Sequence, residues 1–471
     1  MYFNCHAHTM YSNIRLLDCI IQPKKLIDKA IEMGLSGIAV TDHECLSAHM
    51  EVNQYANKIK EQYPNFTIAL GNEIYLTDDR SNGQKYYHFI LLAKDAIGHK
   101  ALRELSSIAW CNSYVDRKME RVPTLKSELT QIVKKYPGHL IATTACLGGE
   151  LSTNALAMSL AEDVGDTNTA YYYHEKIVDF MQFCIELFGD DFYIECAPST
   201  NIEQIKVNRK LYRISNAFNV KMVVGTDAHY LTKEDRIIHK AYLNSKGGER
   251  EVDSFYEFAR LMDKDEVFEL LNKYSFNDEK ITNQILNNTN EIKEKITFYS
   301  LERKQIIPKV EVKDYPALEV ETDFTGRYKP EWDFPVIDSL LRSDNIQERY
   351  WINECLLSLK EKNLYKTEYL ARIETEADVI KYIGEKLDDC LFAYFNTFKH
   401  YIDLFWECGS IVGPGRGSAT GFLSNYLLGI TQLDPIRWNL PYWRFLNKER
   451  AELPSLLLIL GSCKKRTLTI A

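Results

Sequence analysis

The chain has 471 residues, which is room for two or three domains of ordinary size. Its content of 45% hydrophobic and 26% charged residues is typical of packed globular protein and excludes a disordered or fibrous chain. The formal net charge of −9 excludes a general nucleic-acid coat, so any phosphate-binding surface must be local.

No apolar stretch approaches the roughly 18 to 20 residues that a membrane span needs. The first residues, Met1 to His6, lack the basic and apolar segments of a signal peptide. The 11 cysteines form no CxxC pair, which favours reduced thiols over a disulfide framework. We therefore expect a cytoplasmic protein without a membrane partner.

Over the first 230 residues, short β-branched or aromatic runs alternate with segments of helical periodicity. The predicted strands are Met1–Cys5, Gly37–Thr41, Phe66–Tyr75, Tyr87–Ala93, His139–Thr144, Asp191–Cys196 and Lys221–Thr226. Predicted helices between them include Pro23–Met33, Leu46–Gln62 and Ile202–Phe218. Strands that alternate with helices favour a parallel sheet, and seven of them within one domain favour a closed βα barrel.

Side chains that can bind metals lie at or just after the ends of these strands. They are His6 and His8, His43, Glu73, His88, Cys146, and Asp227 with His229; Asp18 is a further candidate. Loops at strand ends in βα architectures converge on one face. Imidazole, carboxylate and thiolate groups together suit zinc, manganese or iron rather than magnesium alone.

Each of these motifs alone has an ordinary structural explanation. Asp and His serve readily in turns and caps, and Cys146 alone would be a buried structural thiol. The ordered set as a whole indicates a metal site, although a site that only stabilises the barrel stays an alternative. No function is assigned to the remaining histidines, His49, His99, His139, His174, His239 and His400.

The ordered set resembles the PHP (polymerase and histidinol phosphatase) family. The matching residues are His6-x-His8-Thr9-x-x-Ser12, Leu17-Asp18, Thr41-Asp42-His43, Glu73, His88, Cys146-Leu147 and Asp227-x-His229. The resemblance implies a distorted seven-stranded barrel over 1–300 that binds two or three divalent ions. The implied ligands are His6, His8, Asp18, His43, Glu73, His88, Cys146, Asp227 and His229.

In this family the site hydrolyses phosphoesters, and in some polymerases it is a 3′–5′ exonuclease. Among the implied ligands, His43, Glu73 and Asp227 are the expected catalytic residues, and Glu73 has two oxygens with which to bridge metals. Asp42, beside His43, is expected to orient an imidazole ligand without binding a metal ion itself.

The composition changes beyond the predicted barrel. The polar segment Asn277–Lys295 predicts a helix that leaves the barrel, and residues 301–330 have the low apolar content of a connection. Helical periodicity returns in Asp338–Leu364 and Thr375–Lys386.

A glycine-rich run, Val412-Gly413-Pro414-Gly415-Arg416-Gly417-Ser418, follows. Glycine permits tight turns and a close approach of the backbone to a ligand. We predict a helix over Ala419–Leu428, whose N-terminus would then suit a phosphate, with Arg416 and Ser418 adding a charge and a hydroxyl. The run lacks the ending of a Walker loop, and an ordinary glycine turn is the alternative.

The run and the segments after it resemble the palm of C-family bacterial replicative DNA polymerases, the alpha subunits of DNA polymerase III, which begin with a PHP domain. The further matching segments are Leu428-Gly429-Ile430-Thr431, Leu433-Asp434-Pro435 and Arg444-Phe445-Leu446-Asn447-Lys448-Glu449-Arg450. The resemblance implies that 331–471 is an incomplete α+β palm. Gly415, Arg416, Gly417 and Ser418 would contact the triphosphate of the incoming deoxynucleotide. DNA, deoxynucleoside triphosphates and other replisome subunits are the implied partners.

The resemblance breaks after Arg450, where the family has the Asp-x-Asp segment that binds catalytic magnesium. No Asp or Glu follows Glu452 here, and apolar side chains cannot coordinate magnesium. We expect no DNA polymerisation from this chain alone, and magnesium only in a complete polymerase. A shifted reading frame is one explanation, since TTG-ATT-TTG for Leu458-Ile459-Leu460 contains GAT-TTT, which encodes Asp-Phe; truncation and a natural short form are others.

The sequence thus predicts the N-terminal portion of a replicative DNA polymerase with a metal-dependent phosphoesterase or exonuclease site. A free-standing phosphoesterase that acts on a small phosphate ester is the alternative enzyme. A noncatalytic scaffold with structural metals is the third possibility.

Overall fold

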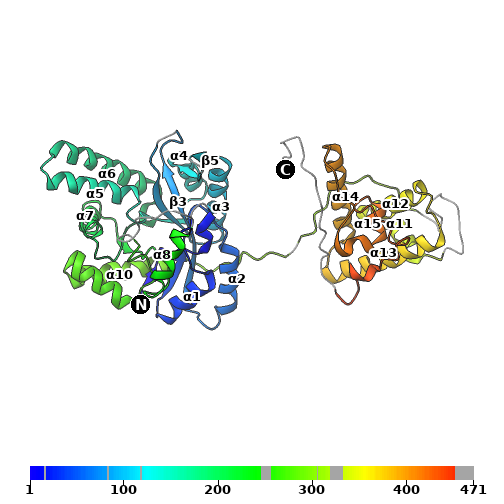
Figure 1. Ribbon diagram of the computed structural model, residues 1–471, viewed down its shortest axis with the longest axis horizontal. Coiled ribbons are helices and arrows are strands. Elements are labelled where there is room, and N and C mark those ends of the chain that lie inside the picture. Colours follow the sequence, from blue (N-terminus) through cyan, green and yellow to red (C-terminus); the bar gives the residue numbers. More distant parts are fainter. Residues whose placement is uncertain are drawn as a thin grey trace. The chain divides into compact units, whose positions relative to one another are not determined.

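The computed structural model describes residues 1–14, 17–81, 84–116, 119–245, 256–304, 306–318 and 333–450. The chain divides into two compact units, Met1–Arg303 and Lys304–Ala471, which are coloured from blue to green and from yellow to red in Figure 1. Leu26 and Val207 belong to the hydrophobic core of the first unit, and Trp351 belongs to that of the second.

The first unit is built around one sheet with the strand order β1-β2-β3-β4-β8-β9-β10, and β7 pairs with β3. The strands are β1 (Phe3–Asn4), β2 (Gly37–Val40), β3 (Thr67–Thr77), β4 (Tyr87–Ala93), β7 (Pro123–Leu125), β8 (Leu140–Thr143), β9 (Phe192–Cys196) and β10 (Met222–Val224). Strands β2, β8 and β9 are buried along their whole length, as expected for a sheet covered on both faces. All seven predicted strands are confirmed.

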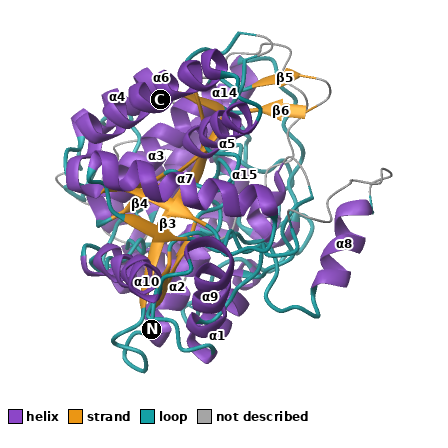
Figure 2. Ribbon diagram, turned by 90° about the vertical axis from the view of Figure 1, so that its left-hand side faces the viewer, coloured by secondary structure: helices purple, strands orange, loops and turns teal. Residues whose placement is uncertain are grey.

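Helices cover this sheet (Figure 2). They are α1 (Pro23–Glu32), α2 (His49–Ile59), α3 (Ala96–Cys111), α4 (Lys126–Lys135), α5 (Glu150–Asp163), α6 (Thr167–Phe188), α7 (Ile202–Phe218), α8 (Arg236–Asn244), α9 (Lys264–Leu270) and α10 (Glu279–Glu294). A small hairpin of β5 (Tyr114–Asp116) and β6 (Met119–Arg121) was not predicted.

The first and last strands lie side by side, so the sheet is a nearly closed seven-stranded barrel. Ala7 and Ala228 form a parallel bridge, and the backbone N–H of His8 donates to the carbonyl of Ala228 at 2.9 Å. The Asn4 side chain also donates to the Thr226 hydroxyl at 2.9 Å. These contacts bring the residues that follow β1 and β10 to the same end of the barrel.

The prediction of a parallel sheet is wrong for β4. This strand is antiparallel to both neighbours, with Tyr75 of β3 opposite His88 and Thr143 of β8 opposite Ile90. The connection 78–86 is too short for the crossover that parallel strands need. The first residues of β4 therefore lie at the barrel end where the parallel strands finish.

The described part of the second unit is helical. It contains α11 (Pro335–Leu341), α12 (Ile346–Glu361), α13 (Thr367–Leu387), α14 (Phe392–Glu407) and α15 (Leu423–Leu427). The predicted helix Asp338–Leu364 is two helices, α11 and α12. The Asn345 side chain caps the start of α12 by accepting from the Gln347 backbone N–H. The β-strands of an α+β palm are not among the described residues, and 451–471 lies outside them.

The helix predicted at Ala419 begins later. Residues Gly417–Gly421 form a 3-10 turn, and α15 starts at Leu423 and is only five residues long. No helix among the described residues combines the length and the apolar character required to cross a lipid bilayer.

Candidate metal centre

The nine side chains predicted as metal ligands gather at one end of the barrel. His6 and His8 follow β1, His43 follows β2, Glu73 lies in β3, His88 in β4, Cys146 follows β8, Asp227 and His229 follow β10, and Asp18 lies in the loop before α1. Most are buried: His6, His8 and Glu73 have no exposed surface. The barrel therefore assembles in space a set that the sequence distributes over more than 200 residues.

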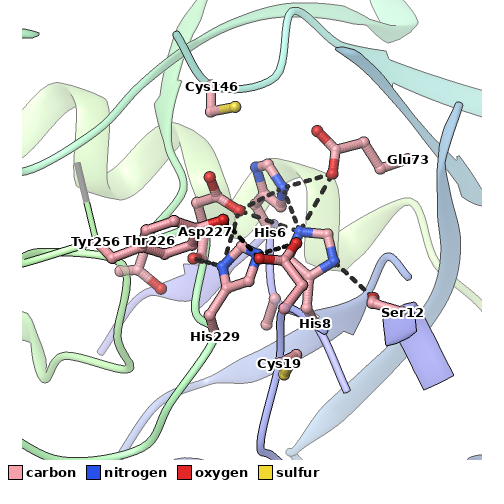
Figure 3. A network of polar contacts seen from close by, with 12 residues as sticks. His6, His8, Ser12, Cys19, Glu73, Cys146, Thr226, Asp227, His229 and Tyr256 are labelled. Atoms are coloured by element: carbon pink, nitrogen blue, oxygen red, sulfur yellow. Dashed lines mark hydrogen bonds and ion pairs between the residues drawn. The ribbon is translucent and has the colours of Figure 1, made fainter. Parts of the chain in front are cut away.

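Four of these side chains form the centre of the cluster (Figure 3). Asp227 Oδ1 lies 3.1 Å from His6 Nε2 and 3.0 Å from His8 Nε2. Glu73 Oε2 lies 3.2 Å from His8 Nε2, and the two histidine nitrogens are 3.1 Å apart. These four donor atoms are close enough to share one cation.

A second group lies on the other side of His8. His8, His43 and His229 offer nitrogen atoms close enough together for one ion. Asp18 Oδ2 joins them, at 3.0 Å from His43 Nε2 and 3.2 Å from His229 Nε2. Asp18 accordingly lies within the cluster.

A third group shares Glu73 with the first. Glu73 Oε1 lies 2.6 Å from His88 Nδ1, and the Cys146 thiol lies 3.5 Å from the same nitrogen. Glu73 Oε2 also lies 2.7 Å from His43 Nδ1. Glu73 is thus the carboxylate that contacts members of all three groups, which suits a bridge between ions.

Groups other than the clustered donor atoms orient three of the imidazoles. The Nδ1 atoms contact Glu195 at 2.7 Å for His6, the Ser12 hydroxyl at 3.1 Å for His8 and the Asp227 carbonyl at 2.7 Å for His229. A proton on each Nδ1 leaves the Nε2 lone pair directed into the cluster, which is the arrangement of metal-binding histidines.

Burial and mutual charge perturb the pKa values of the cluster in opposite directions. Burial would lower the pKa of His6, but Asp227, Glu195 and Glu73 hold it well above its usual value. Burial would raise the pKa of Glu73, yet His88, His43 and His6 hold it well below its usual range. Burial, with Asp227 and Glu73, raises the pKa of the Cys146 thiol. The charged form of each of these carboxylates and imidazoles is therefore stabilised by its oppositely charged neighbours in the cluster.

Three donor atoms of the cluster lack an ordinary hydrogen bond. Both oxygens of Glu73 and Nδ1 of His43 are buried and make no contact with hydrogen-bond geometry, although their neighbours lie within 2.7 Å. Buried polar atoms are normally satisfied, so lone pairs that converge without hydrogens between them fit positive ions. The cluster is consistent with a site for several divalent ions.

Three residues that support the cluster were not predicted. Glu195 contacts His6, the Tyr256 hydroxyl donates to Asp18 at 2.5 Å, and the His239 Nε2 atom contacts the Asp18 carbonyl at 2.6 Å. Glu195 had a sequence signal, because it is a charge within the apolar strand β9. No local pattern pointed to the other two.

Asp42 acts differently from the prediction. Its carboxylate accepts hydrogen bonds from the Thr9 backbone at 2.6 Å and the Ser12 hydroxyl at 2.7 Å. It therefore orients an imidazole indirectly, through the Ser12 hydroxyl that contacts His8.

The glycine loop of the second unit is exposed at Arg416 and half-buried at Ser418. Gly415 and Gly417 have φ angles of +117° and +68°, which non-glycine residues rarely adopt, so the glycines are required for the turn. The α-helix whose N-terminus was predicted to face a phosphate at this loop begins later, at Leu423. The first N–H groups of α15, at Leu423 and Ser424, donate instead to the buried carboxylate of Glu376.

Comparison with known families accounts for both units. Residues 4–199 match the PHP domain, and residues 340–457 match the bacterial DNA polymerase III alpha NTPase domain. This chain is a homologue of DNA polymerase III alpha subunits.

Curated relatives match this chain along nearly its whole length. It is 40% identical to a probable DNA polymerase, YorL, of Bacillus subtilis and to a DNA-directed DNA polymerase of Bacillus phage SPbeta, in each case over 96% of this chain and 36% of the relative. It is 29% identical to the DNA polymerase III alpha subunit of Aquifex aeolicus, over 97% of this chain and 36% of that protein. The chain thus spans about a third of the length of these relatives.

Proposed function

We propose that the first unit is a metal-dependent phosphodiesterase that removes nucleotides from the 3′ end of DNA, within the N-terminal part of a replicative DNA polymerase. The observation that carries this proposal is the buried convergence of His6, His8, Glu73 and Asp227. The matches to polymerase relatives support DNA as the substrate rather than a small phosphate ester.

The nine clustered side chains are the proposed ligands of two or three zinc, manganese or iron ions, and His43, Glu73 and Asp227 are the ligands closest to catalysis. Ions bound here would neutralise the charge of a phosphodiester and lower the pKa of a water molecule. Hydrolysis forms a bond between a water oxygen and phosphorus, breaks the bond from phosphorus to the 3′ oxygen and leaves a proton on that oxygen. The products are a nucleoside 5′-monophosphate and a shortened strand with a 3′ hydroxyl.

The second unit has a proposed part in nucleotide binding by a complete polymerase. Gly415, Arg416, Gly417 and Ser418 would contact the triphosphate of a deoxynucleotide, and the exposure of Arg416 leaves its charge available. The exposed Arg444 and Arg450 are further candidates. Other replisome subunits are partners that we expect of the complete polymerase.

The test compares two substrates with manganese or zinc supplied: a 3′-labelled single DNA strand and histidinol phosphate. We expect release of the terminal nucleotide by the unmodified chain, and a loss of at least about 100-fold in the double variant His8→Ala, His229→Ala, because two of the three groups lose a ligand. The exposed His174 provides a matched control, since His174→Ala should leave the rate unchanged.

The competing functions give different results. Hydrolysis of histidinol phosphate alone would favour a small-molecule phosphatase. Metal binding without hydrolysis of either substrate would favour a structural site. Undiminished nuclease activity in the double variant would show that the cluster is not the active site.

A further inference from the structure

A pocket opens directly beside the cluster of predicted metal ligands. Its inner end is formed by Cys146, Thr226 and Asp227, and its walls come from the segment after β9, the start of α7 and the segment around Phe258. A group attached to a phosphate at the cluster would extend into this space.

The lining of the pocket suits a flat, uncharged group. Leu147, Ala197, Pro198 and Phe258 contribute apolar surface. The described lining contains no lysine or arginine. Its charged members are Asp227 and Glu203, which is exposed in the first turn of α7. Carboxylates repel a second phosphate, so the pocket does not suit a phosphate group.

Two buried polar side chains have hydrogen-bonding capacity to spare at this pocket. Gln204 and Ser199 are 6% and 5% exposed. The Gln204 amide donates to Asn208, and the Ser199 hydroxyl accepts from the Asn201 backbone. Within the described ranges, no donor reaches the Gln204 carbonyl oxygen and no acceptor receives the Ser199 proton. Gln204 Oε1 is not among the fully buried atoms that lack a partner, so it is open to the pocket, where a donor group of a ligand can reach it.

We propose that this pocket binds the nucleoside whose 5′ phosphate lies at the cluster, with its base against Phe258 and its polar edge toward Ser199 and Gln204. The inference rests on the proposed phosphodiesterase function and names the part of the substrate that the site recognises. An aromatic side chain recognises any base by stacking. The pocket thus provides affinity for a terminal nucleotide without strict sequence preference.

The test uses two esters with the same leaving group, thymidine 5′-(p-nitrophenyl phosphate) and methyl p-nitrophenyl phosphate. Phe258→Ala should lower kcat/KM about 10-fold for the thymidine ester, because it removes the stacking surface, and leave the methyl ester unchanged. Gln204→Met, which keeps the side-chain length, should act in the same direction. Lys206→Ala, on the same helix but outside the pocket, is the control. Metal content verifies that each variant retains the cluster.

The outcomes separate this inference from the function on which it rests. Equal effects of Phe258→Ala and Gln204→Met on both esters, or no effect on either, would overturn the nucleoside pocket while the phosphodiesterase stands. Failure of the unmodified, metal-loaded chain to hydrolyse either ester would overturn both.

Discussion

Glu195 stabilises the metal cluster from behind His6. Its carboxylate contacts His6 Nδ1 at 2.7 Å and accepts from the Thr143 hydroxyl at 2.5 Å. Space for it depends on Gly225, since a Cβ there would collide with the Glu195 carboxylate and with Cβ of His6. Glu195 is therefore a positioning residue that also makes His6 more basic.

Glu195→Gln is expected to weaken metal binding about 10-fold, because the amide keeps the shape but removes the negative charge beside His6. Competition with a chelator measures the affinity. The exposed Glu203 provides the control variant Glu203→Gln. Equal affinity of the two variants and the unmodified chain would contradict a role for the Glu195 charge.

A pair of histidines outside the cluster should make folding sensitive to acid. His49 Nδ1 lies 3.1 Å from His99 Nε2, and His49 Nε2 lies 2.9 Å from the Gly71 carbonyl. Burial, with His99 nearby, lowers the pKa of His49 to about 3, and burial lowers the pKa of His99 to about 4. Both are held neutral in the folded chain.

The folded pKa values lie below the unfolded value of about 6.5, so the unfolded chain binds more protons and stability falls as pH drops from about 6.5 toward 4. We expect a loss of about 1 kcal/mol per histidine for each pH unit below 6. Denaturant unfolding between pH 7 and 5 should give a shallower loss for His49→Gln, His99→Gln than for the unmodified chain. His174→Gln should not change the slope. Parallel curves for all three would refute the assignment.

Among the elements, helix α13 fixes the segment that follows the glycine loop. Glu376 of α13 accepts from the backbone N–H groups of Leu423 and Ser424 at 2.6 and 2.9 Å, and from Arg372 at 2.9 Å. Arg372 also donates to the carbonyl of Gly421 at 2.7 Å. This pair of side chains holds the 3-10 turn and α15 against α13.

Glu376→Ala is expected to destabilise the second unit by about 3 kcal/mol, since two buried N–H groups lose their acceptor. Tryptophan fluorescence during denaturant unfolding measures this, because Trp351 is buried in that core. The exposed Glu368, in the first turn of α13, provides the control Glu368→Ala. A shift of less than about 0.5 kcal/mol would show that the contact is not stabilising.

Among the elements, the sequence predicted which segments form strands and helices better than it predicted strand direction and helix boundaries. The apolar run of β4 predicts a strand, but its antiparallel direction follows from the short connection 78–86 and not from the run itself. The start of α15 was misplaced because its cap, Glu376, lies far away in the chain. Eight of the nine clustered side chains were predictable because they lie in or just after a strand; Asp18 lies in the loop before α1, and Tyr256 and His239 reach it only through tertiary folding.

At the scale of the whole molecule, each unit has its own hydrophobic core. We therefore expect the first unit to fold and bind metal ions without the second. All nine clustered residues lie within Met1–Arg303. We expect residues 1–303, produced alone, to bind as many metal ions as the full chain. Elemental analysis of both samples, with circular dichroism as the control for folding, measures this. A folded but metal-free 1–303 would contradict the independence of the units.

The hairpin of β3 and β4 determines when the chain can first hold an ion. The side chains of Glu73 and His88 meet diagonally across this local pairing, while Asp227 and His229 lie beyond the last strand. During synthesis the hairpin is made well before β10, so Glu73 and His88 can come together before the other donors are present. Asp227 and His229 join them only when the barrel closes, so an ion that needs the whole cluster can be held only by the completed first unit.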